Sequence, residues 1–135
     1  MRLFIVSTAV FAAACLARPG LSAPPAPPAP SPMMPPPDGR LLVRQTCGTC
    51  HTLGKGEKSS EGPNLYGVVG RKAGAMPGFN YSPAFRKALA GKVWTPQLLD
   101  RWLTNSQKVA PDSGMAFFND NPAQRKAIID YLSKP

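Results

Sequence analysis

The segment that most constrains how this chain can fold is a long glycine-rich stretch. Residues 52–91 contain eight glycines and three prolines and follow no sustained helical or alternating period, so most of them are expected to form loops. Forty residues of loop are uncommon in a compact domain, because such a segment cannot build a core by itself. The stretch is therefore expected to wrap around something, and a bound prosthetic group would supply apolar surface to a small domain.

The first 37 residues are not expected to join this fold. Residues 1–23 are typical of an export signal, with Arg2 followed by an apolar run that is too short to span a membrane. Residues 24–37 contain nine prolines and no charge, which predicts an extended linker. Residues 38–135 then form one domain, and its 98 residues exclude a two-domain enzyme or a Rossmann dehydrogenase.

A second interpretation of the N-terminus is a bacterial lipoprotein signal that ends before Cys15, since small residues precede this cysteine. Lipid on Cys15 would turn the following residues into a membrane tether. Simple cleavage near Ala17 or Ala23 would instead release the protein from the membrane. The sequence leaves both interpretations open, so the expected location is the periplasm, with or without a membrane anchor.

The capping residues and the apolar spacing predict an all-α domain. Asp38, Thr95 and Asn121 are each placed to cap a helix, and a shorter helix is expected over residues 83–90. Residues 105–119 are expected to form a second loop. Inward-facing positions are predicted at Leu98, Leu99, Trp102 and Leu103 and, in the last helix, at Ile128, Tyr131 and Leu132.

The sharpest motif consists of two cysteines three residues apart and a histidine that follows directly: Cys47, Cys50 and His51. On a helical turn each thiol can add to one vinyl group of a haem, while the imidazole reaches the iron. A thioredoxin-type pair would need an α/β chain, and a zinc site would need four ligands where only these three residues and Cys15 exist. One covalently attached haem c is therefore expected, with His51 as an axial ligand.

The opposite face of the iron must be filled by a second side chain or stay open to water and external ligands. His51 is the only histidine, which leaves methionine and lysine as candidates. Met115 lies 64 residues after His51, in an expected loop that can fold back over the open face. A loop methionine is more often a packing residue. With haem expected, Met115 is nevertheless the favoured sixth ligand.

The segment from Gly39 to Leu132 resembles the class I c-type cytochromes of the mitochondrial and bacterial kind, and the resemblance extends beyond the haem motif. It implies the cytochrome c fold, in which three to five helices wrap around one covalently bound haem. The matching stretches are Gly62-Pro63-Asn64-Leu65, Gly67 to Gly74, Pro77 to Ser82, Trp94, and Met115-Ala116-Phe117.

The resemblance also implies roles for individual residues. The Pro63 carbonyl would accept a hydrogen bond from His51 and so fix its tautomer. A haem propionate would be held by Arg71, Tyr81 and Trp94. Further contacts with the haem are implied for Leu65, Leu99 and Phe117, and the last helix would cross the first near Gly39 and Val43.

The chain departs from this family close to the expected ligand. Ser113 can still offer a hydroxyl toward a propionate, but the usual lysine beside the ligand is absent and Asp112 is added. Trp102 replaces the usual phenol that faces the methionine sulfur, and Phe85 stands where asparagine is frequent. Both changes are expected to remove polar groups near the haem.

Together these features predict an exported single-haem electron-transfer protein, not an enzyme. From Gly39 onward, fourteen basic residues accompany six acidic ones, so redox protein partners with acidic docking surfaces are expected. The basic residues form no block, so nucleic acid is not expected as a partner, and the protein is expected to be a monomer. Two alternatives stay open: a haem peroxidase or gas sensor with a labile sixth ligand, and a tethered cytochrome subunit of a larger oxidoreductase.

Overall fold

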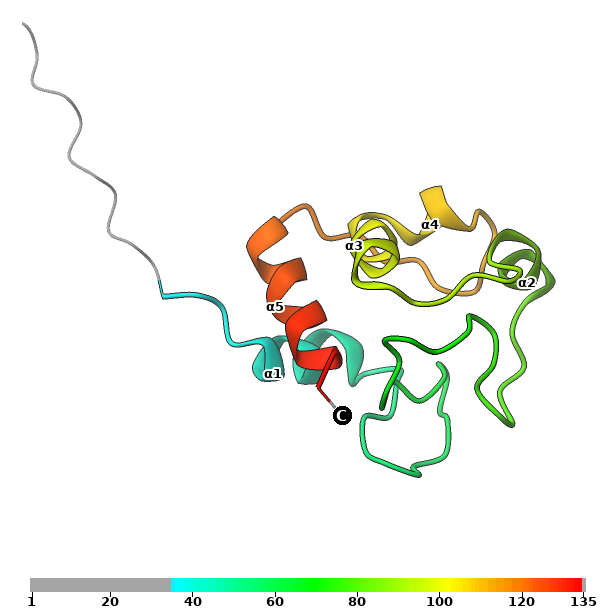
Figure 1. Ribbon diagram of the computed structural model, residues 1–135, viewed down its shortest axis with the longest axis horizontal. Helices are drawn as coiled ribbons and strands as arrows, with labels where there is room; N and C mark the ends of the chain where they lie inside the picture. Colours follow the sequence, from blue (N-terminus) through cyan, green and yellow to red (C-terminus); the bar gives the residue numbers. More distant parts are fainter. Residues whose placement is uncertain (1–34, 135) are drawn as a thin grey trace, which may run out of the picture. The chain divides into compact units, whose positions relative to one another are not determined.

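The computed structural model describes residues 35–134 (Figure 1). The expected export signal, Cys15 and the linker as far as residue 34 lie outside the described residues. Between residues 35 and 134, none of the helices has both the length and the apolar character that a membrane span requires.

The regular structure of residues 35–134 is helical, and its elements follow one another in the order shown in Figure 1. Helix α1 passes directly into the wider turn η1, so these two form one continuous segment. Extended pairing in the described chain is limited to two isolated bridges, Lys72 with Val93 and Asn105 with Phe118. The all-α prediction is confirmed. The elements are α1 Gly39–Leu42, η1 Val43–Cys47, α2 Pro83–Ala88, α3 Pro96–Thr104, α4 Ser106–Val109 and α5 Pro122–Leu132.

The three predicted caps begin their helices as expected. The side chains of Asp38, Thr95 and Asn121 each accept a backbone N–H two or three residues further on, at 2.9, 3.1 and 3.0 Å. These bonds satisfy N–H groups that have no partner inside the helix. A proline follows the second and the third cap, where its missing N–H costs nothing.

Two boundaries differ from the prediction. The short helix α2 ends at Ala88, two residues earlier than expected. The segment 105–119 is not all loop, because it begins with the helical turn α4. Asn105 caps this turn and accepts the N–H of Lys108 at 3.2 Å. A helix of four residues is too short to show a hydrophobic period, so the pattern could not reveal it.

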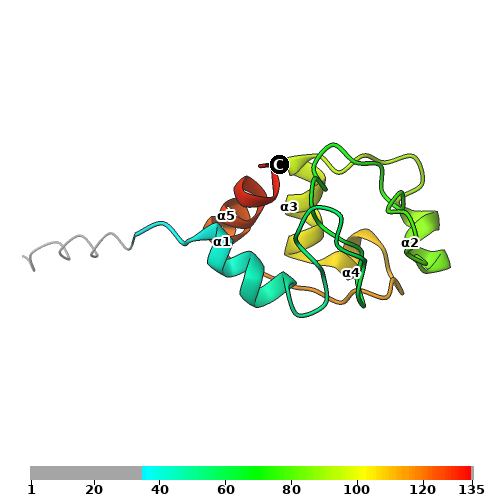
Figure 2. The same ribbon diagram turned by 90° about the horizontal axis from the view of Figure 1, so that it is seen from below.

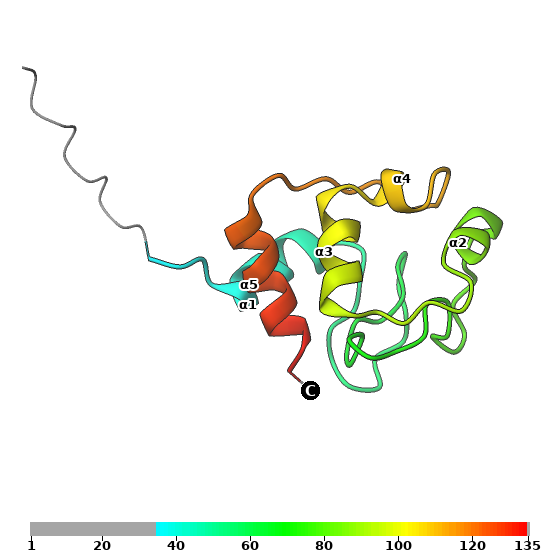
Figure 3. The ribbon, with the colours of Figure 1, turned by 45° about the horizontal axis from the view of Figure 1, so that its top comes forward.

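The N- and C-terminal helices cross at a glycine, as the resemblance implied, and Figures 1 to 3 show α1 beside α5 in every view. A side chain at Gly39 would collide with the carbonyl oxygen of Ala127 and press on Tyr131. Val43 and Ile128 are completely buried. Because the helix backbones approach so closely, this crossing closes one end of the core.

Helix α3 supplies the centre of the core. Its predicted inward residues, Leu98, Leu99, Trp102 and Leu103, are all buried. Helix α5 packs against α3, and the glycine-rich segment, which is irregular apart from α2, runs past α3 (Figure 3). Between this segment, α3 and the chain that follows α4 lies a large cavity.

Candidate functional site

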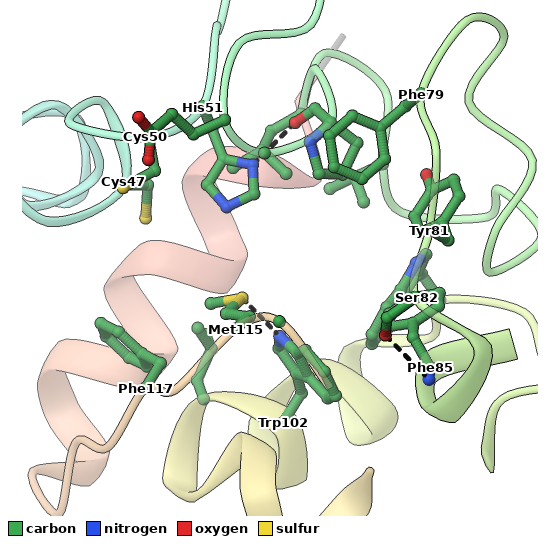
Figure 4. Close-up of a pocket in the computed structure, with 18 of the residues that line it drawn as sticks. Cys47, Cys50, His51, Phe79, Tyr81, Ser82, Phe85, Trp102, Met115 and Phe117 are labelled. Atoms are coloured by element: carbon green, nitrogen blue, oxygen red, sulfur yellow. Dashed lines mark hydrogen bonds between the residues drawn. The ribbon is translucent and has the colours of Figure 1, made fainter. Parts of the chain in front are cut away.

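A cavity of about 890 Å³ opens between the glycine-rich segment and α3 (Figure 4). This volume is in the range of cofactor and small-molecule sites. Aromatic and aliphatic side chains form much of its wall, with a few polar groups among them. All eight residues predicted from the sequence as a cofactor site line this one cavity: Cys47, Cys50, His51, Pro63, Arg71, Tyr81, Trp94 and Met115.

The His51 imidazole points into the cavity and is held from behind by the backbone (Figure 4). Its Nδ1 lies 2.7 Å from the Pro63 carbonyl oxygen. Since a carbonyl only accepts, Nδ1 carries the proton and donates it, which leaves the lone pair on Nε2 free. Burial lowers the pKa of His51, which favours the neutral form of the ring that can bind a metal.

Gly62 fixes the position of the imidazole, a role that the sequence reading did not assign. A Cβ at Gly62 would overlap the His51 ring and come within 2.8 Å of its Nε2. The backbone N–H of Gly62 donates to the Cys50 carbonyl at 2.7 Å, which ties the glycine-rich segment to the cysteine turn. Only a residue without a side chain lets the loop approach the ring this closely.

Both thiols are free in the structure, and they lie on the same wall of the cavity as His51 (Figure 4). Cys47 is buried, and burial raises the pKa of its thiol, whereas Cys50 is exposed. The Thr46 hydroxyl lies 3.5 Å from the Cys47 sulfur. The two sulfurs therefore face the space where an attached group would lie.

Met115 enters the cavity from the wall opposite His51 (Figure 4). The Trp102 indole Nε1–H donates to the Met115 sulfur at 3.3 Å. The expectation that Trp102 removes a polar group from this region is therefore wrong, because the indole N–H reaches the sulfur that a phenol would otherwise face. Thioether sulfur has two lone pairs, so one stays available for a metal while the other accepts this bond.

Arg71, Tyr81 and Trp94 converge on the wall formed by the glycine-rich segment and the start of α3. The Arg71 guanidinium donates to the carbonyl oxygens of Asn64 at 2.7 Å and Tyr66 at 3.3 Å. Burial lowers the pKa of Arg71. Tyr81 and Trp94 are themselves buried. A half-buried guanidinium anchored in this way can receive an acidic group of a bound cofactor with less loss of hydration than an exposed one.

Ser113 does not line the cavity. Its hydroxyl is engaged within the loop, where it donates to the Met115 carbonyl at 3.4 Å and accepts from Gln107 Nε2 at 3.3 Å. The expectation that Ser113 offers its hydroxyl to a propionate is not met, because the loop turns this side chain inward.

Aromatic rings form a continuous cluster along one wall, which the sequence did not reveal. Phe85 stacks on Tyr81 with ring centroids 4.8 Å apart and meets Trp102 edge-on at 5.8 Å. Trp94 and Trp102 lie 5.5 Å apart, also edge-on. Such contacts add stability beyond simple burial. They hold Trp102, the donor to Met115, in one orientation.

These donors fit a covalently bound haem and not the other metal sites considered. An imidazole Nε2 and a thioether sulfur face one cavity from opposite walls, with two thiols beside the imidazole. Across residues 35–134, no three His, Cys, Asp or Glu side chains are grouped to hold a metal ion, which removes support for a zinc site. The described part of the chain likewise has no strand of the kind that a thioredoxin-type thiol pair would follow.

Curated proteins similar to this chain are cytochromes c. Cytochrome c2 of Rhodopila globiformis is 43% identical over 98 residues, which is 72% of this chain and 90% of that protein. Cytochrome c type-1 of Ascaris suum is 36% identical over 97 residues, or 71% of this chain and 84% of the relative. Cytochrome c of Trypanosoma brucei brucei is 44% identical over 79 residues, covering 58% and 83%. No family model matches the sequence.

The chain therefore belongs to the class I c-type cytochromes. The helical structure is that of the cytochrome c fold. The protein binds a single covalently attached haem c and transfers electrons with redox partners.

Proposed function

We propose that the protein is an exported electron carrier whose haem iron is held by His51 and Met115. The observation that carries this proposal is that a neutral imidazole and a thioether enter one cavity from opposite walls (Figure 4). Neither side chain needs to move to a different wall to meet a metal between them. When bound, the haem supplies one-electron chemistry between the ferrous and ferric states.

The residues around these two ligands hold them in place. The Pro63 carbonyl keeps the imidazole proton on Nδ1 and directs Nε2 into the cavity. The Trp102 N–H keeps the Met115 sulfur turned toward the same space. A carrier gains from ligands that stay in place in both oxidation states, because little rearrangement then accompanies electron transfer.

The two cysteines are proposed to hold the haem covalently, and Arg71, Tyr81 and Trp94 to receive a propionate. Protein with attached haem should keep its colour after extraction with acidified acetone, because thioether bonds survive this treatment. Changing both Cys47 and Cys50 to serine should leave the haem extractable. Covalent haem in that double variant would contradict the attachment site.

Whether Met115 binds the iron distinguishes an electron carrier from a peroxidase or a gas sensor. The last two need an open or labile sixth position. The oxidised wild-type protein should show the weak red absorption band of iron bound to a thioether sulfur, and its reduced form should bind carbon monoxide slowly. Met115→Ala should abolish the band and speed carbon monoxide binding. The half-buried methionine in the glycine-rich segment gives a matched control, and Met76→Ala should change neither property.

The wild-type spectrum also tests the alternative function. A wild-type protein without the band, with fast carbon monoxide binding, would favour the sensor or peroxidase. An unchanged band in Met115→Ala would assign the sixth position to another residue.

The carrier is proposed to act in the periplasm as residues 38–135, after an export signal at 1–23 and a linker at 24–37. A membrane tether would consist of lipid on Cys15, followed by the linker. Cell fractionation tests this, with Cys15→Ala as the comparison. Membrane-bound wild type and soluble Cys15→Ala would support the tether, whereas soluble wild type with a mature start after residue 15 would exclude it.

A further inference from the structure

A buried serine at the start of α4, Ser106, forms hydrogen bonds with the loop that carries Met115. Ser106 is completely buried, and its hydroxyl donates to the Met115 carbonyl at 2.9 Å. The same hydroxyl accepts the backbone N–H of Phe117 at 2.8 Å. The Ser106 backbone N–H donates to the Phe117 carbonyl at 3.0 Å. One residue therefore binds the chain at Met115 and again two positions later.

The neighbouring Gln107 holds the part of the loop that precedes Met115. Its Nε2 donates to the Met115 carbonyl at 2.7 Å and to the Ser113 carbonyl at 3.2 Å. Its Oε1 accepts the backbone N–H of Asp112 at 3.0 Å. Asp112 has a φ of 61°, a conformation that is unfavourable for residues with a side chain and needs support from its surroundings.

These bonds converge on the backbone of Met115. Its carbonyl oxygen receives the Ser106 hydroxyl at 2.9 Å and the Gln107 amide at 2.7 Å, and the Ser113 hydroxyl lies further away at 3.4 Å. Lifting Met115 out of the cavity would break both bonds and leave the buried Ser106 hydroxyl with only the longer contact to the Phe117 carbonyl, at 3.3 Å, as an acceptor. The Trp102 bond orients the sulfur, whereas Ser106 and Gln107 hold the backbone that carries it.

Neither Ser106 nor Gln107 lines the cavity. They therefore act on a bound haem only through the lining residues whose backbone they hold, Met115 and Phe117, of which Met115 is the proposed ligand. Exchange of the sixth ligand requires Met115 to leave, and the rate of this step follows the local opening of its loop.

We propose that Ser106 and Gln107 are positioning residues that keep Met115 in place and so set the rate at which external ligands reach the sixth position of the iron. This inference rests on the proposed ligation by Met115. Helix α4 would then keep external ligands away from the iron. An electron carrier needs this protection, whereas a gas sensor needs an accessible sixth position.

Imidazole binding to the oxidised protein tests the proposal, because imidazole must wait for Met115 to leave. Ser106→Ala removes the hydroxyl, and Gln107→Met removes the amide while keeping a side chain of similar length. Each variant should bind imidazole about fivefold faster than wild type, the factor expected for one lost hydrogen bond on the opening step. The red absorption band should also disappear at a lower pH than in wild type.

Two matched controls separate this effect from general destabilisation. Ile128→Val removes one methylene from a completely buried residue at the α1–α5 crossing, away from the Met115 loop. Ser133→Ala deletes a hydroxyl that donates to a carbonyl within α5 at 2.7 Å. Unfolding by denaturant gives the global stability of each variant, and imidazole binding in the two controls should follow the wild-type rate.

The proposal is overturned if Ser106→Ala and Gln107→Met bind imidazole no faster than a control of equal stability. Gln107 is only half-buried, so Gln107→Met keeps the test decisive if Ser106→Ala fails to fold. If the wild-type protein shows the red band but both variants bind imidazole at the wild-type rate, only this inference is refuted. A wild-type protein without the band removes the Met115 ligation and this inference with it.

Discussion

Replacing Trp102 with phenylalanine should lower the reduction potential of the protein. The change removes the indole N–H that donates to the Met115 sulfur at 3.3 Å and keeps an aromatic ring in the cluster. A hydrogen bond withdraws electron density from the sulfur. Ferric iron depends more on this density than ferrous iron does, so the bond favours the reduced state and its loss favours the oxidised state.

The size of the shift follows from the value of one hydrogen bond. A single bond contributes roughly 0.5–1 kcal/mol net, and a difference of this size between oxidation states corresponds to about 20–45 mV for one electron. Spectroelectrochemical titration of both proteins measures the potential directly. The red band should remain in Trp102→Phe, because Met115 itself is unchanged.

A smaller side chain at position 102 could also admit water, so the comparison needs a packing control. Phe85 lies in the same aromatic cluster and carries no N–H group, so Phe85→Leu loosens the packing without removing a donor. Its potential should change less than that of Trp102→Phe. An unchanged or higher potential in Trp102→Phe, or an equal shift in both variants, would refute a role for the bond.

Three further predictions follow from close contacts and from charge. Gly39→Ala should destabilise the protein by about 1–3 kcal/mol in denaturant unfolding, since the new Cβ would strike the Ala127 backbone; equal stability would show that the crossing has room. Gly62→Ala should displace the His51 ring and reduce the yield of low-spin protein, whereas an unaltered spectrum would contradict this contact. Electron transfer with an acidic partner should slow as salt shortens the Debye length to about 8 Å, and Asp112→Lys should speed it; a rate independent of salt would exclude steering by the basic surface.

The features that the sequence predicted correctly depend on interactions between residues that are close together in the chain. Asp38, Thr95 and Asn121 cap helices through bonds to residues two or three positions away, so short patterns contain the needed information. The spacing of Cys47, Cys50 and His51 likewise places three groups on one turn, and the structure finds them on one wall of the cavity.

The parts that the sequence missed depend on contacts between distant residues. Helix α4 is too short for a period, and its function is visible only where Ser106 meets Met115, nine residues away. Ser113 was expected to face the cavity, but the turn at Asp112 directs its hydroxyl into the loop. The bond from Trp102 to Met115 depends on both side-chain orientations, which residue types alone do not specify.

The most direct test of Met115 ligation is the proton NMR spectrum of the reduced protein. A methyl group fixed against the face of a haem lies in its ring current, so the Met115 methyl signal should move far upfield of ordinary methyl signals. This signal should persist in Met76→Ala and vanish in Met115→Ala. A wild-type spectrum with no upfield methyl signal, or a signal that survives in Met115→Ala, would contradict coordination of the iron by Met115.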